Sequence, residues 1–287
     1  MHIPTHWQRA SGTTRGADGR ELACGAWGWG DDDATARARA EERMRRALDR
    51  LRAGAQARHG ERDYGYGDRP LREELVEVLT RDASGAPSAA ITRNRMGALV
   101  LNTTRLLFLD IDVRAPQESL AERLRSWLRK APRRDPLTAE RDRLVRALRQ
   151  AAPRASFRVY RTARGFRALA LDRAFDPASD ETAALMRTTG TDPAFAQLCR
   201  AQQSFRARLT PKHWRIRVAA PPGQFPRKPR EQAEFEAWRE KYEIHGARFA
   251  VCRAIETVGA GATSPELAPL ILLHDRMTRA TEVLPLA

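Results

Sequence analysis

The clearest hydrophobic periodicity in the chain is a helical stripe between residues 33 and 53. Its apolar members are Ala40, Met44, Ala47, Leu48 and Leu51. Residues at these spacings lie on one face of an α-helix, and arginines and glutamates occupy the remaining positions. Asp31, Asp32 and Asp33 offer candidates for the N-terminal cap. The pattern predicts a solvated helix over 33–53, preceded by a strand and a turn over 20–30.

A β-strand pattern follows between residues 89 and 113. Apolar runs over 89–92, 97–101 and 106–113 are separated by short polar turns. The last run has apolar residues at both alternating positions, which is typical of a strand buried on both faces. We therefore expect three strands here, with 106–113 as the central strand of a sheet.

The remainder of the chain mixes helices with strands. Two apolar segments, 157–162 and 166–172, meet at Ala163-Arg164-Gly165, which indicates a hairpin. Helices are expected from Arg69-Pro70 through Leu79 and over 117–130, 136–150, 179–188, 193–204, 230–242 and 265–276, with a strand over 248–258 and an exposed loop over 221–230. This order predicts the α+β class, with a mixed or antiparallel sheet and flanking helices.

The division of the chain follows from one polar stretch. Residues 53–68 are polar and carry several glycines, which is typical of a linker. We expect residues 1–68 to form an N-terminal strand and helix region packed on the core, and residues 69–287 to form the α+β core.

Positive charge is concentrated in one part of the sequence. The chain has 287 residues and a net charge of +15, and nearly all of its basic residues are arginine. Residues 141–230 hold 20 Lys and Arg against 6 Asp and Glu, a net of +14 that leaves +1 for everything else. A local surplus of this size predicts an anionic partner, either nucleic acid or nucleoside triphosphates.

Other features of the sequence restrict location and chemistry. No apolar run reaches the roughly 20 residues that span a bilayer, and the first residues lack a secretory pattern. We therefore expect a cytoplasmic protein without a membrane partner. Cys24, Cys199 and Cys252 are widely spaced and resemble buried small hydrophobes rather than metal ligands. The histidines are scattered, and His274 beside Asp275 is typical of a helix cap or a packed side chain.

Two carboxylates stand at the end of the apolar strand 106–113. Asp110 and Asp112 are two residues apart, so on a strand both point to the same face. Paired carboxylates of this kind can bind Mg²⁺ or Mn²⁺, because hard cations prefer oxygen ligands. The alternative is that Asp occurs at strand ends because it favours turns.

The predicted hairpin offers donors for a phosphate group. Its candidate residues are Arg161, Thr162, Arg164, Gly165 and Arg167. Glycine at a turn lets the backbone approach a phosphate, and arginine presents forked donors that match phosphate oxygens. A solvated edge hairpin in an arginine-rich protein is the alternative explanation.

A third candidate is the basic segment from Phe205 to Val218. Its basic residues are Arg206, Arg208, Lys212, Arg215 and Arg217. They alternate with apolar residues that include Trp214, so each half of the segment has one apolar and one basic face. Basic rows that carry an aromatic residue suit binding along a nucleic-acid strand. A sheet edge with one solvated face would give the same alternation.

These motifs together resemble the archaeo-eukaryotic primase superfamily, which includes bacterial primase-polymerases. In that family, a strand ending in two acids spaced by one residue precedes a hairpin of the form Ser-Gly-x-Gly-x-His. Leu106 to Asp112 is similar to the first motif, and Thr162-Ala163-Arg164-Gly165-Phe166-Arg167 is similar to the second. The resemblance implies a palm-like or primase-like core over about residues 90–175.

The resemblance also implies roles for individual residues. Asp110 and Asp112 would bind catalytic metals, the hairpin would bind the incoming nucleotide, and a later acid would complete the site. Asp172 is the first candidate for that acid and Asp275 the second. Ala163 and Arg167 depart from the family's glycine and histidine. A haloacid-dehalogenase motif also has an Asp-x-Asp strand, but the lysine that it needs is missing between Thr162 and Asp172.

Two functions are consistent with this sequence. The first is a metal-dependent nucleotidyltransferase of the primase-polymerase type that acts on nucleic acid. The second is a non-catalytic protein of the same fold that binds nucleic acid or nucleotides. A third acid that lies beside Asp110 and Asp112 in space would favour the first.

Overall fold

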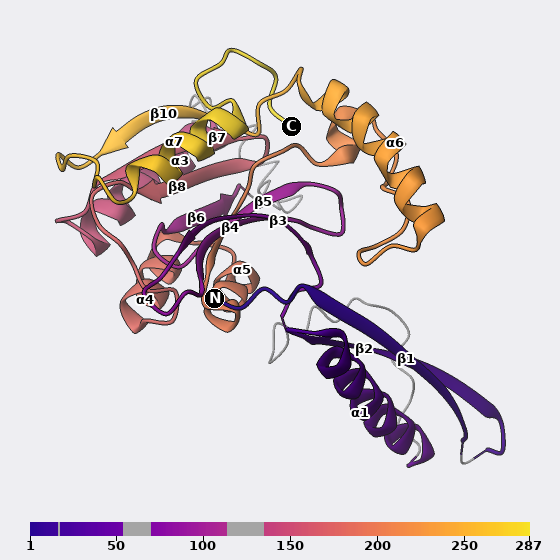
Figure 1. Cartoon of the computed structure of the whole chain (residues 1–287). Helices are drawn as coiled ribbons and strands as arrows, with labels where there is room; N and C mark the ends of the chain where they lie inside the picture. The colour runs from indigo at the N-terminus through magenta and orange to yellow at the C-terminus, as the bar shows by residue number, and fades with distance from the viewer. Residues whose placement is uncertain (17, 54–69, 114–134) are drawn as a thin grey trace, which may run out of the picture.

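The fold is of the α+β class, as expected from the sequence. The computed structural model describes residues 1–16, 18–53, 70–113 and 135–287. The linker expected after Ala53 and the helix expected over 117–130 lie outside these residues. Figure 1 shows two groups of elements: a β-hairpin with one long helix at one end of the molecule, and a larger body of sheets and helices. Within the described ranges, no helix is long and apolar enough to cross a membrane.

The N-terminal group consists of a hairpin covered by a helix. Strands β1 (His6–Arg15) and β2 (Glu21–Gly30) pair antiparallel, and α1 (Asp33–Arg52) packs on them. The second strand and the helix are as expected from the sequence, whereas β1 was not expected, because its mixed polar residues give no apolar alternation. The Asp32 side chain accepts a hydrogen bond from the Thr35 backbone at 2.7 Å, which caps the helix.

A four-stranded antiparallel sheet begins the larger body. Its order is β3 (Glu74–Arg81), β4 (Pro87–Arg93), β5 (Leu99–Thr103) and β9 (Phe205–Arg208). The helix predicted through Leu79 is therefore wrong. The segment from Glu74 to Arg81 contains β-branched Val76, Val78 and Thr80, and pairing with β4 satisfies its backbone as an outer strand.

A second four-stranded antiparallel sheet holds the acid pair. Its order is β10 (Cys252–Val258), β7 (Phe157–Thr162), β8 (Gly165–Ala170) and β6 (Phe108–Asp112). The hairpin of β7 and β8 is confirmed. The expected central position of the acid-bearing strand is wrong, because β6 ends the hydrogen-bonded order. The strand is apolar because both of its faces are buried. Phe108 and Leu109, which point to opposite faces, are fully buried although β6 has only β8 as a neighbour in the described sheet.

Helices cover these sheets and enclose the main core. They are α3 (Pro136–Ala151), α4 (Asp180–Thr189), α5 (Pro193–Gln202), α6 (Pro229–Gly246) and α7 (Ala268–Thr278), with a 3₁₀ turn, η1, at His213–Ile216. All five lie within a few residues of their predicted ranges. The largest fully buried side chains of the main core include Phe108, Phe157, Tyr160, Phe205 and Leu144.

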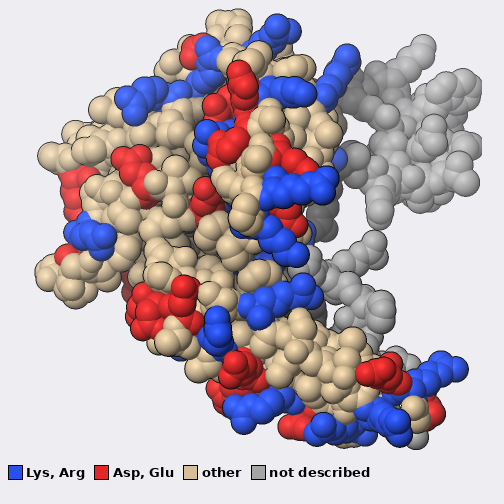
Figure 2. Space-filling view, turned by 45° about the vertical axis from the view of Figure 1, so that its right-hand side comes forward, with Lys and Arg blue, Asp and Glu red and all other residues tan. Residues whose placement is uncertain are grey.

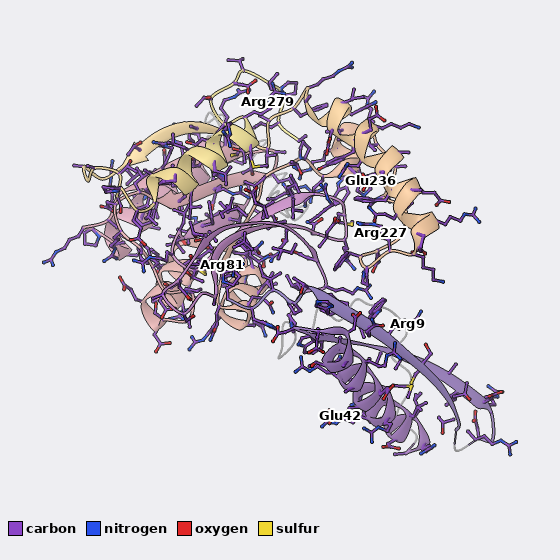
Figure 3. All side chains as sticks on the ribbon, in the orientation of Figure 1. Arg9, Glu42, Arg81, Arg227, Glu236 and Arg279 are labelled. Carbon is purple, nitrogen blue, oxygen red and sulfur yellow. The ribbon has the colours of Figure 1, made fainter. Side chains whose placement is uncertain are left out.

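Helix α6 is attached to the first sheet through arginine and phenylalanine. The Arg227 guanidinium stacks 3.4 Å from the centre of the Phe235 ring and donates a hydrogen bond to Glu74 of β3 at 3.1 Å. The Arg93 guanidinium of β4 lies 5.7 Å from the centre of the same ring, and its Nε lies 3.8 Å from the same Glu74 carboxylate. Arg227 lies between α6 and the strands in Figure 3. Both arginines are therefore structural residues rather than candidates for ligand binding.

The contact between α1 and β2 depends on a glycine. A Cβ atom on Gly28 would lie 2.1 Å from the Ala36 carbonyl oxygen and 2.2 Å from the Ala40 nitrogen. Gly28→Ala should therefore lower the free energy of unfolding by about 3 kcal/mol, measured by urea denaturation.

Gly246→Ala is the matched control, because a Cβ there meets nothing nearer than 3.8 Å. We expect this second substitution to leave the stability unchanged or to raise it by up to about 1 kcal/mol. Equal stability of both variants and the wild type would contradict the packing of α1 on β2.

Candidate functional site

Asp110 is engaged by an arginine on the neighbouring strand. The pairing of β6 with β8 places Asp110 opposite Arg167 and Asp112 opposite Gly165. Arg167 donates from Nε to Asp110 Oδ1 at 2.8 Å and from Nη2 to Oδ2 at 3.1 Å. Both carboxylate oxygens of Asp110 therefore accept a hydrogen bond in a forked ion pair, the strongest geometry available to these groups.

The Arg167 guanidinium is fixed by further contacts. Its side chain is 2% exposed, and Nη1 donates to the Arg208 carbonyl oxygen of β9 at 3.1 Å. The same nitrogen lies 3.2 Å from Nε2 of His274 on α7. Burial raises the pKa of Asp110, but the charge and hydrogen bonds of Arg167 outweigh it and hold that pKa below its ordinary value. Asp110 is therefore a carboxylate at neutral pH.

A buried chain of polar side chains continues from Arg167 through α7. Because arginine only donates, Nε2 of His274 accepts, and Nδ1 carries the proton that it donates to Asp275 at 3.0 Å. The Asp275 carboxylate also accepts from the Tyr160 hydroxyl at 2.6 Å and from Arg158. Burial lowers the pKa of His274, so the ring is neutral at pH 7. His274 is thus a packed side chain, one of the two roles that the sequence indicated.

Four cationic side chains gather beside the acid pair. Arg164 comes from the turn between β7 and β8, Arg208 from the end of β9, and Lys212 and Arg215 from the segment around η1. We call these four residues the basic cluster. Burial, followed by the charges of Arg208, Arg215 and Arg164, lowers the pKa of Lys212 to about 8, while Asp112 opposes the shift. The acid pair and the basic segment, which are far apart in sequence, therefore meet in space.

The charge of the basic cluster is only partly compensated. Arg164 is exposed, and Lys212 and Arg215 are partly exposed. Nε of Arg208 is buried and finds no hydrogen-bond partner among the described residues. Burial and the charge of Arg167 lower the pKa of Arg208 to about 10. Cations held together in this way attract an anion, because each one raises the electrostatic free energy of the others.

An exposed tryptophan borders the basic cluster. Trp214 is 48% exposed, whereas large aromatic side chains elsewhere in the described larger body are mostly buried. The Lys212 ammonium lies 5.2 Å from its ring centre, and the His213 ring meets it edge to face at 4.9 Å. These contacts orient the indole and leave part of its surface open to a planar ligand.

The hairpin residues are mostly structural. A Cβ atom on Gly165 would lie 1.9 Å from the Ile111 carbonyl oxygen, so glycine is needed for β8 to pair with β6. The Gly165 N–H donates to the Thr162 hydroxyl at 3.1 Å, and Arg161 donates to the Gly165 carbonyl at 2.7 Å. Among the hairpin residues expected to bind phosphate, Arg164 belongs to the basic cluster, whereas Thr162, Gly165 and Arg161 hold the turn.

The basic face predicted for residues 205–218 is also revised. Arg206 is 11% exposed, and its Nη2 donates to both carboxylate oxygens of Glu73 at 2.7 and 2.8 Å, which removes it from the candidate surface. The second half of the segment is the 3₁₀ turn His213–Ile216 rather than a strand, so its side chains do not alternate between two faces. Arg217 is exposed in the left-handed region, at φ 59°, just after that turn.

Neither candidate for a third acid stands beside the acid pair. Asp172 lies past the end of β8, five residues after Arg167, the residue that pairs with Asp110. It accepts a hydrogen bond from the Ser156 backbone at 3.0 Å. Asp275 is separated from Asp110 by His274 and Arg167. Among the described residues, no three His, Cys, Asp or Glu side chains are grouped to hold a metal.

Positive and negative side chains are mixed on the surface of the molecule. On the face drawn in Figure 2, Lys and Arg side chains are interspersed with Asp and Glu rather than forming one uniform basic area. Positive charge on this face is therefore not continuous.

Comparison with family models, curated proteins and solved structures found no match to this chain.

The neutral His274 gives the folded protein a specific pH dependence. Its folded pKa lies below the ordinary value of 6.5, so the unfolded chain binds one more proton as the pH falls below 6.5. The free energy of unfolding should therefore decrease below pH 6.5, with a limiting slope of about 1.4 kcal/mol per pH unit from this group.

Urea denaturation between pH 7.5 and 5 measures this slope. His274→Asn should remove that component, whereas substitution of the exposed His245 by Asn should leave it unchanged. The same pH slope in the wild type and in His274→Asn would contradict a buried, neutral His274.

Proposed function

We propose that the protein binds single-stranded nucleic acid or nucleotides through their phosphate groups at the basic cluster, without catalysing nucleotidyl transfer. The observation that carries the proposal is that Arg164, Arg208, Lys212 and Arg215 lie close enough to repel one another, beside the acid pair. Forked arginine donors and an ammonium group match phosphate oxygens in both geometry and charge. The net charge of +14 within residues 141–230 supports the same type of ligand.

The exposed indole favours single strands or free nucleotides over duplex. Bases that are not paired can stack on an aromatic side chain while the adjacent phosphate contacts cations. Trp214 and Lys212 offer these two groups together, with the Lys212 ammonium over the Trp214 ring, 5.2 Å from its centre. A base on Trp214 would place its own phosphate near Lys212 and Arg215.

The binding function is better supported than the nucleotidyltransferase expected from the resemblance to primases. Two-metal catalysis needs free carboxylate oxygens around both ions. Both oxygens of Asp110 are engaged by Arg167, and Asp172 faces Ser156 instead of the acid pair.

Free Cys24, Cys199 and Cys252 fit the reducing cytoplasm, the location that we propose for this binding.

Binding can be measured by fluorescence anisotropy with a labelled single-stranded oligonucleotide at several salt concentrations. Lys212→Ala and Arg215→Ala should each weaken binding and reduce the slope of log affinity against log salt by about 1. Trp214→Ala should weaken binding about tenfold through lost stacking, and Trp214→Phe should retain most of the affinity.

Arg149→Ala is the matched control. Arg149 is an exposed arginine of α3 within the same charged stretch but outside the basic cluster. Its removal should change the affinity by less than about twofold, within the range of a distant surface charge. An equal loss in Arg149→Ala and Lys212→Ala would mean that binding follows total charge rather than this site.

A primer-extension assay tests the absence of catalysis. With Mn²⁺, labelled nucleotides and a primed template, we expect the wild type to give no more extension than Asp110→Ala, because the Asp110 oxygens are bound to Arg167. Extension by the wild type that disappears in Asp110→Ala would replace the binding proposal with the nucleotidyltransferase.

A further inference from the structure

We propose that the site binds its phosphate ligand without a divalent cation, because Arg167 supplies a fixed positive charge at Asp110 where a metal would otherwise be needed. This inference rests on the proposed phosphate binding. It adds that this binding depends on the positive charge of Arg167 and needs no divalent metal ion. It differs from the expectation of Mg²⁺ or Mn²⁺ that Asp110 and Asp112 suggested from their spacing.

The first reason is that the acid pair is not a pair of available ligands. Arg167 occupies Asp110 Oδ1 at 2.8 Å and Oδ2 at 3.1 Å. A divalent cation between Asp110 and Asp112 would have to share the Asp110 oxygens with Arg167 and lie beside its fixed positive charge, which opposes the binding of a second cation. Asp112 then remains as a single exposed carboxylate with cations around it, and cations close to a carboxylate oppose the approach of another positive ion.

The second reason is that contacts from several elements hold Arg167 in place. Its guanidinium is held from three elements: Asp110 on β6, the Arg208 carbonyl on β9 and His274 on α7. Phe108 covers it, with the ring centre 5.9 Å from the guanidinium carbon. Moving this side chain would leave a buried charge without a partner and would break contacts between both sheets and α7.

The third reason is the balance of charge at the site. Asp110 and Arg167 cancel each other, which leaves the four cations of the basic cluster against Asp112 alone, a net of +3. This charge suits phosphate groups directly. Mg²⁺ bound to the phosphates would reduce their attraction to the cluster rather than bridge them to a carboxylate. Free Mg²⁺ should therefore leave the affinity unchanged or weaken it.

The wild-type protein provides the first test. Affinity for a labelled single-stranded oligonucleotide is measured with EDTA and with Mg²⁺ at the same total ionic strength. We expect the affinity in Mg²⁺ to be equal to or lower than that in EDTA. A rise of about tenfold or more in Mg²⁺ would overturn the inference while leaving phosphate binding intact. No binding under either condition would contradict the proposed function as well, so the two failures are distinguishable.

Arg167→Gln provides the second test, because it frees the Asp110 carboxylate beside the basic cluster. The added negative charge should weaken binding in EDTA about tenfold, and Mg²⁺ should restore part of the affinity. The double variant Asp110→Asn with Arg167→Gln removes both charges and should bind with less than about threefold dependence on Mg²⁺. Circular dichroism verifies that each variant is folded.

The outcome of the variants decides whether Arg167 acts as the built-in cation. If Arg167→Gln keeps the wild-type affinity in EDTA and gains nothing from Mg²⁺, Arg167 does not have the role proposed here. If Arg167→Gln is unfolded, the wild-type comparison of EDTA with Mg²⁺ remains a complete test of metal independence.

Discussion

The ion pair between Asp110 and Arg167 joins the parts of the molecule that form the site. Arg167 lies on β8, and its guanidinium contacts β6, the end of β9 in the other sheet, and His274 of α7. The two sheets and α7 thus meet at one buried charge. Such a charge is tolerated only when all of its partners are in place, because loss of one partner typically costs 3–5 kcal/mol in other proteins. The position of the basic cluster depends on this junction, since Arg208 and the hairpin turn both approach the acid pair there.

The same ion pair determines what the acid pair can do. On the strand, Asp110 and Asp112 differ by only two residues, yet their surroundings are unlike. Asp110 faces a buried guanidinium, and Asp112 faces solvent and the basic cluster. Two carboxylates that sequence spacing makes equivalent therefore have separate roles: one neutralises an internal charge, and the other lies within a cationic surface suited to phosphate. The binding function and the metal independence that we propose both follow from this difference.

Sequence patterns predicted the elements better than their arrangement. The apolar stripe of α1, the hairpin of β7 and β8 and the helices from α3 to α7 follow from local periodicity and turns, which the sequence carries directly. The position of β6 at the edge of its sheet could not be inferred from the sequence. An apolar run shows that both faces of a strand are buried, but not whether the strand has one or two neighbours in the sheet. For Glu74–Arg81, strand pairing with β4 overrode a weak helical pattern. At the site, the hairpin motif indicated Arg164, and the alternating basic segment indicated Arg208, Lys212 and Arg215. The ion pairs of Arg206 with Glu73 and of Arg167 with Asp110 could not be predicted, because they depend on tertiary contacts that no local pattern records.

The most direct test of the account is a crystal structure of the protein with a bound single-stranded oligonucleotide, grown in the presence of Mn²⁺. The anomalous signal of manganese locates the ion independently of the phosphates. We expect phosphate oxygens within hydrogen-bond distance of Lys212 and Arg215, an intact fork between Asp110 and Arg167, and no manganese bound to Asp110. Manganese bound between Asp110 and Asp112, with Arg167 displaced, would contradict it.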